Sequence, residues 1–149
     1  MEFERAVRET RGLGDDAYQP GMQALPRNDR ARVDCHNPAL LTGSVFVDEA
    51  LRHAQPNAPR WDYAVGVMDG RTEKIVWVEV HPATTHGVTE VLRKLAWLRQ
   101  WLAGDGLPLA RFPARHAWVA SGRINIPPGS PQYKRAASTG LLPKRRLKL

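Results

Sequence analysis

The chain has 149 residues, 42% of them hydrophobic, so it is long enough to bury the core of one domain of ordinary size. Its 22 lysines and arginines outnumber its 15 aspartates and glutamates, and the net charge of +7 favours nucleic acid as a partner, unless the excess only serves solubility. The single cysteine, Cys35, excludes an internal disulfide, and no run of 18 apolar residues could span a membrane.

The N-terminus, MEFERAVRETRGLGDD, is charged throughout and has no apolar signal segment, so we expect a cytoplasmic protein. Residues 1–34 mix charges with glycine and proline, which predicts a loosely ordered N-terminal arm with one short helix near residues 2–11. An α/β core is expected over residues 35–126, followed by a basic, proline-containing C-terminal segment over residues 127–149.

The first element of the expected core is a helix in the stretch SVFVDEALRHA, residues 44–54. Ser44 is a suitable N-cap, and the apolar residues recur at an imperfect helical spacing. Asp48 and Glu49 lie on this helix. The following QPNAP, with two prolines, ends it.

A β-hairpin is expected next, with strands near residues 61–68 and 74–81. Both segments are rich in β-branched and aromatic residues. The dipeptide Asp69-Gly70 between them is typical of a tight hairpin turn.

The hairpin brings two acids together. Pairing that is symmetric about a point between Gly70 and Arg71 places Asp62 directly opposite Glu79. Opposed side chains have Cβ atoms about 4.5–5.5 Å apart, so the two like charges repel unless a cation neutralises them. Because side chains alternate along a strand, Glu79 and His81 share a face. This pattern is consistent with a divalent metal site.

The two acids could also have separate structural roles. A register slip of one residue would put them on opposite faces of the sheet. In this interpretation Asp62 caps a turn or pairs with an arginine such as Arg60, and Glu79 faces water at a strand end.

A long helix is expected over residues 89–103, with Thr89 as its N-cap. Lys94 falls on the border between its apolar face and solvent. Trp97 and Trp101 could stack on nucleic-acid bases, but tryptophans beside leucines at helical spacing indicate core positions. Dimerisation through an exposed part of this helix is left open.

The C-terminal third predicts a strand over residues 115–122, a short strand over 123–126 and a short helix near 131–138. Basic residues gather there and could bind the phosphates of a nucleic-acid backbone, although such tails often only face solvent. The candidates for nucleic-acid binding are Arg123, Lys134, Arg135, Lys144, Arg145 and Arg146.

The order helix, strand, strand, helix, strand over residues 44–122 resembles the core of the PD-(D/E)XK, or restriction-endonuclease-like, nuclease superfamily. The likeness includes an acid on the first hairpin strand and a Glu-x-basic motif on the second. It implies an α/β fold with a mixed central β-sheet flanked by helices.

The resemblance also implies a site. Asp62 and Glu79 would bind Mg²⁺ or Mn²⁺, with Glu49 on the preceding helix as a third candidate ligand and Asp48 as its nearest alternative. The family motif carries a lysine two residues after the glutamate, where this chain has His81. Either His81 takes that role or Lys94 supplies the ammonium group from the following helix.

The function implied is hydrolysis of DNA or RNA phosphodiesters by Asp62, Glu79, His81 and Lys94. Hard cations held by carboxylate oxygens can offset the charge that develops on phosphate. The alternative from another class is a non-catalytic basic module of the same fold that binds nucleic acid or a protein.

Two further arrangements have weaker support. Cysteine and histidine could form a zinc site from Cys35, His36, His53, His81 and His86, but neither a CxxC pair nor an HxxxH spacing is present. A cysteine hydrolase would need Cys35 beside His81 or His116, and nothing in the sequence brings them together.

Overall fold

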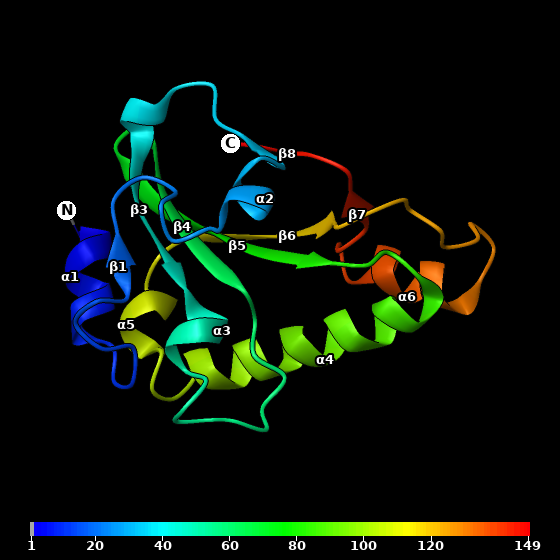
Figure 1. The fold of residues 1–149 in the computed structure, drawn as a ribbon, viewed down its shortest axis with the longest axis horizontal. Helices are drawn as coiled ribbons and strands as arrows, with labels where there is room; N and C mark the ends of the chain where they lie inside the picture. The colour runs from blue at the N-terminus through cyan, green and yellow to red at the C-terminus, as the bar shows by residue number, and fades with distance from the viewer. Residues whose placement is uncertain (1) are drawn as a thin grey trace.

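A computed structural model describes residues 2–149, and its centre is one six-stranded sheet (Figure 1). The strands lie in the order β1-β3-β4-β5-β6-β7. The expected α/β class with a mixed central sheet is confirmed. The bounds are β1 Tyr18–Gln19, β3 Leu41–Phe46, β4 Tyr63–Asp69, β5 Thr72–His81, β6 Ala114–Ala120 and β7 Pro143–Lys144.

The sheet changes from antiparallel to parallel at its middle. Neighbours from β1 to β5 are antiparallel, whereas β6 runs parallel to β5 and β7 parallel to β6. The carboxyl ends of β5 and β6 therefore lie side by side, where His81 pairs with Ala120. This edge carries the site described below.

Most helices cover one face of the sheet, and α4 runs along it (Figure 1). A two-stranded parallel sheet and the segment around α2 cover the other face. The helices are α1 Glu2–Glu9, α2 Arg27–Arg30, α3 Val47–Ala50, α4 Thr85–Leu102, α5 Leu107–Ala110 and α6 Pro131–Ser138, with a 3₁₀ turn η1 at Pro38–Leu40. The small sheet pairs β2 Val33–Asp34 with β8 Leu147–Lys148.

The β4–β5 hairpin has the expected register. Val65 pairs with Val76, and the ladder closes at Asp69 and Thr72 around a two-residue turn. Gly70 has a φ of 64°, and no other residue type among the described residues has a positive φ. A positive φ at the first turn position alone is the pattern of a type II′ turn, which suits the twist of the strands. The short turn fixes which residues of β4 and β5 share a face.

The expected helix over residues 44–54 is wrong. Ser44 and Val45 belong to β3, which pairs with β1 and β4, and only the four-residue α3 follows it. Ser44 is no helix cap, since its hydroxyl accepts a hydrogen bond from the Ala24 N–H at 3.0 Å. β3 carries β-branched and aromatic residues that fill a buried strand better than a helix.

The short helix expected near residues 2–11 is present as α1, but the N-terminal arm is not loosely ordered, because its scattered apolar residues are buried. Phe3 and Val7 on α1 pack into the core on the α4 side of the sheet, and Leu25 packs on the opposite face. The C-terminal segment is likewise packed, with Leu147 buried and α6 where a short helix was expected.

Helix α4 begins four residues before its expected start. Thr84, not Thr89, is the N-cap, and its hydroxyl accepts the Gly87 N–H at 2.9 Å. A Cβ on Gly87 would lie 2.2 Å from the carbonyl oxygen of Pro82, so only glycine allows this close approach of helix to strand end. Among residues 2–149, no helix is both long and apolar enough to cross a membrane.

Candidate functional site

Asp62 and Glu79 lie together at one end of the hairpin. Asp62 immediately precedes β4, and Glu79 is the eighth residue of β5. The Asp62 N–H donates to Glu79 Oε1 at 3.1 Å, and the Val80 N–H donates to Asp62 Oδ2 at 3.0 Å. The side chain of each acid thus accepts a hydrogen bond from a backbone N–H at or next to the other acid.

Lys94 reaches this pair from α4. Its Nζ lies 2.5 Å from Glu79 Oε2 and 3.7 Å from Asp62 Oδ1. The Glu79 side chain is 0% exposed, while those of Asp62 and Lys94 are 14% and 21% exposed. One oxygen of each acid therefore points at the same position, and the lysine ammonium group fills it.

His81 extends the cluster toward the surface. Its Nδ1 lies 3.5 Å from Glu79 Oε2, and its Nε2 lies 3.3 Å from Glu90 Oε1. His86, which is largely exposed, contacts the same Glu90 oxygen at 3.4 Å. Both candidates for the basic role, His81 and Lys94, are therefore next to Glu79.

Burial raises the pKa of Asp62 to about 7, and the neighbouring Glu79 charge adds to this effect. The Lys94 charge and the hydrogen bond from Val80 work in the opposite direction but are outweighed. The Asp62 carboxyl group therefore gains or loses a proton near neutral pH. Carboxyl groups with pKa values shifted in this way are often found at functional sites.

The two basic groups keep their protons more strongly than usual. For His81, the hydrogen bond to Glu79 raises the pKa, and it outweighs the burial that lowers it. For Lys94, burial lowers the pKa, but the nearby Glu79 and Asp62 charges together raise it above its ordinary value. Glu79 thus has Lys94 as a cationic partner, and His81 as a second one when the imidazole is protonated.

The contact between His81 and Glu79 has a direct test. We expect Glu79→Gln to lower the pKa of His81, because the acceptor that holds its proton loses its charge. NMR titration of the imidazole proton signals measures the shift. His116 is the control, since burial lowers its pKa and it packs against Trp61 instead. An unchanged His81 pKa would contradict this geometry.

The other interpretation, in which Asp62 pairs with Arg60 and Glu79 faces water, is wrong. Arg60 pairs with Asp48, with Nε and Oδ1 3.0 Å apart, and not with Asp62. Glu79 is buried and does not face water. The register that places both acids on the α4 face is the one observed.

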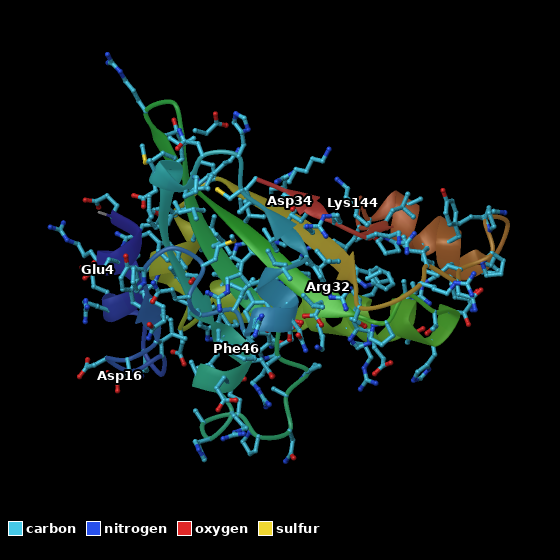
Figure 2. All side chains as sticks on the ribbon, turned by 45° about the horizontal axis from the view of Figure 1, so that its top comes forward. Glu4, Asp16, Arg32, Asp34, Phe46 and Lys144 are labelled. Atoms are coloured by element: carbon cyan, nitrogen blue, oxygen red, sulfur yellow. The ribbon has the colours of Figure 1, made fainter. Side chains whose placement is uncertain are left out.

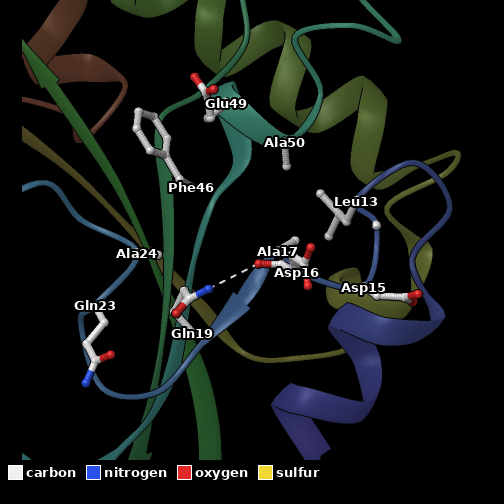
Figure 3. Close-up of a pocket in the computed structure, with 11 residues that line it drawn as sticks. Leu13, Asp15, Asp16, Ala17, Gln19, Gln23, Ala24, Phe46, Glu49 and Ala50 are labelled. Carbon is white, nitrogen blue, oxygen red and sulfur yellow. Dashed lines mark hydrogen bonds between the residues drawn. The ribbon is translucent and has the colours of Figure 1, made fainter.

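Glu49 lies in a different place from the expected metal site. It pairs with Arg52 at 3.3 Å and lines a separate depression that also contains Asp15 and Asp16 (Figure 3). Asp48 is the acid of this region that acts on the site, because its charge contributes to raising the pKa of Asp62. Glu49, expected as a third ligand, is therefore not placed beside Asp62 and Glu79.

The other cysteine and histidine arrangements are not assembled. Within residues 2–149, no group of three or more His, Cys, Asp or Glu side chains is arranged to hold a metal ion. Cys35 lines a depression with His36, whereas His81 contacts Glu79 and His116 packs edge-on against Trp61. The zinc site and the cysteine–histidine pair therefore have no geometric support.

The expected basic residues divide into two groups. Lys134 and Arg135 lie exposed on α6, and Lys144 is exposed on β7. The other three line one depression together with a fourth arginine that the sequence did not single out: Arg32, Arg123, Arg145 and Arg146. Figure 2 shows the side chains of this region, with Arg32, Asp34 and Lys144 labelled.

Trp97 and Trp101 belong to the core, as expected. Their rings stack with centroids 5.6 Å apart, and they are 9% and 5% exposed. The Trp97 indole N–H donates to Gln55 Oε1 at 2.9 Å. Their role is to hold α4 in place.

Sequence reasoning gave Glu90 no role in the site. A signal for it was available, because His86, Glu90 and Lys94 follow one another at intervals of four and therefore lie on one side of a helix.

No protein-family model, no curated protein and no solved structure matches this chain.

Proposed function

We propose that this protein is a metal-dependent nuclease that hydrolyses nucleic-acid phosphodiesters. The observation that carries the proposal is the convergence of Asp62, Glu79 and Lys94 at a buried strand end, with His81 alongside. The hairpin, the long helix and the parallel strand follow one another in the order of the PD-(D/E)XK resemblance, although β3 and the short α3 stand where its first helix was expected. The net charge of +7 suits a polyanionic substrate.

Asp62 and Glu79 are the two carboxylates that could hold a divalent cation, which would take the place of the Lys94 ammonium group, although no group of three or more His, Cys, Asp or Glu within residues 2–149 is arranged for a metal. Glu79 Oε2 and Asp62 Oδ1 already point at one cationic group, the ammonium of Lys94. Mg²⁺ is usually held by only one or two carboxylates, with water and substrate phosphate completing its shell. Bound by these two acids, such an ion would supply a Lewis acid that offsets phosphate charge and makes a nearby water more acidic.

The chain's own residues would divide the remaining work. Asp62 and Glu79 hold negative charge where a cation is needed, and their backbone hydrogen bonds keep them oriented. Lys94 would place its positive charge on the phosphate. His81, whose pKa is raised, can hold a proton close to the site and give it to the departing oxygen.

One observation favours a second candidate function. Lys94 lies close enough to Glu79 to neutralise it without any metal. The cluster would then be a structural ion pair, and the protein a non-catalytic basic module that binds nucleic acid. In that case the exposed basic residues of α6 and β7 would carry the activity.

Incubation of the protein with DNA and with RNA tests the two functions. We expect cleavage with Mg²⁺ or Mn²⁺, none with a chelator, and at least a 100-fold loss in Glu79→Gln, since carboxylate binding of the ion is removed. Asp105→Asn, at an exposed residue without an ion pair, is the matched control and should retain activity. Binding without cleavage under any divalent metal would favour the second function.

A further inference from the structure

Four arginines line a depression of about 540 Å³ beyond the end of β6. They come from two distant parts of the sequence, Arg32 from the segment before β2 and the others from the last third of the chain. Its remaining lining is small and uncharged, with Ala120, Ser121 and Gly122. The fold therefore concentrates positive charge around an open space.

Arg32 is the fixed member of the group. Its two terminal nitrogens donate to the carbonyl oxygens of Ala120 and Ser121 at 3.2 and 3.0 Å. Its Nε is buried and has no hydrogen-bond partner among the described residues. A guanidinium held by the backbone in this way is positioned before any ligand arrives.

Carboxylates offset only part of the positive charge of the four arginines. Within residues 2–149, Arg146 is the one member of the four that forms an ion pair, with Asp34 at 2.5 Å. Arg32 makes hydrogen bonds only to uncharged carbonyls, and Arg123 and Arg145 are exposed. Three guanidinium charges thus remain available to an anion.

This depression starts at the end of β6, beside the last residue of β5. His81 pairs with Ala120, and the Ser121 N–H donates to the His81 carbonyl oxygen at 3.2 Å. Ser121 in turn accepts from Arg32. Neighbouring strands lie about 4.8 Å apart, which is the separation of the two backbones here. The acids lie on the α4 face, and Arg32 precedes Val33, which packs on the other face, so a nucleic-acid strand that reaches both places would cross this end of the sheet.

We infer that the arginine depression binds a backbone phosphate of the same nucleic-acid strand whose phosphodiester lies at Asp62 and Glu79. This inference rests on the proposed function for its substrate class. Guanidinium groups suit phosphate because their planar N–H forks match its oxygens. The role of the depression is to position the strand, and its residues take no part in bond breaking.

Equilibrium binding of a fluorescent oligonucleotide, with a chelator present to prevent cleavage, tests this inference. We expect Arg123→Ala and Arg145→Ala each to weaken binding about tenfold. Each should also reduce the slope of log affinity against log salt, by about 0.9 for duplex and about 0.7 for single strands. Arg71→Ala removes the same charge at the hairpin turn, at the opposite end of β5, and should change neither quantity as strongly.

The outcomes separate this inference from the proposed function. Cleavage-competent protein in which the depression variants bind like Arg71→Ala would overturn the inference and leave the nuclease intact. Weakened binding in the depression variants, without cleavage by the native chain, would support the depression and remove the nuclease. An acidic peptide that loses affinity in these variants while the oligonucleotide does not would assign the depression to a protein partner and overturn the inference.

Discussion

Replacing Lys94 by methionine is expected to lower the free energy of unfolding by about 3–5 kcal/mol at pH 8. Methionine keeps much of the length of the side chain but leaves the fully buried Glu79 without its ammonium partner at 2.5 Å. Asp62 then adds a second negative charge at low exposure. The loss should shrink below pH 7, where Asp62 takes up a proton.

Urea unfolding of both proteins at pH 8 and pH 5 measures this effect. Lys74→Met is the matched control, because Lys74 pairs with the exposed Asp69 at the hairpin end and such pairs contribute about 0–1 kcal/mol. If the two variants lost the same small free energy, the Lys94 pair would not be formed in solution.

Asp62→Asn should have the opposite effect on stability. The pKa of Asp62 is about 7 in the folded chain against 3.8 as its ordinary value, so the folded state binds more protons between these values. Stability is therefore lost as the pH rises from about 4 through 7. One pKa unit corresponds to about 1.4 kcal/mol, so asparagine, which stays neutral, should stabilise the fold by up to about 4 kcal/mol at pH 8.

The same variant should lose at least 100-fold in cleavage if Asp62 holds a catalytic ion. Unfolding curves at pH 8 and pH 4, with cleavage rates on the same samples, provide the measurement. The stability difference should fall below about 1 kcal/mol at pH 4, where the native carboxyl is protonated in the folded state. If the variant were less stable than the native chain at pH 8, the Asp62 charge would stabilise the fold, which would contradict a pKa raised by burial.

The face that the acids share could be predicted because it depends on local chemistry. A two-residue turn at Gly70 and Arg71 fixes the register, and the register determines which side chains lie together. Neither property depends on contacts with the rest of the chain. Asp62, Glu79 and His81 were therefore placed together from the sequence.

Other features depend on tertiary contacts that leave no periodic signal. The residues around Val45 fit a helical pattern, yet pairing with strands on both sides makes them β3. Phe3 and Leu25 are isolated in a charged segment and are buried only because distant elements cover them. The choice between His81 and Lys94 depended on how α4 is rotated against the sheet, and the structure brings both to Glu79.

Because the turn at Gly70 and Arg71 fixes the strand register, the two ends of the hairpin respond differently to changes in sequence. Around the acids, an exchange of one side chain changes the charges and contacts of its neighbours but leaves the strand pairing unchanged. At the tip, a single inserted residue that no bulge absorbs would shift the pairing along both strands and turn Asp62 away from Glu79, eight residues from the turn. The length of the loop at the far tip is therefore part of what places the two acids together.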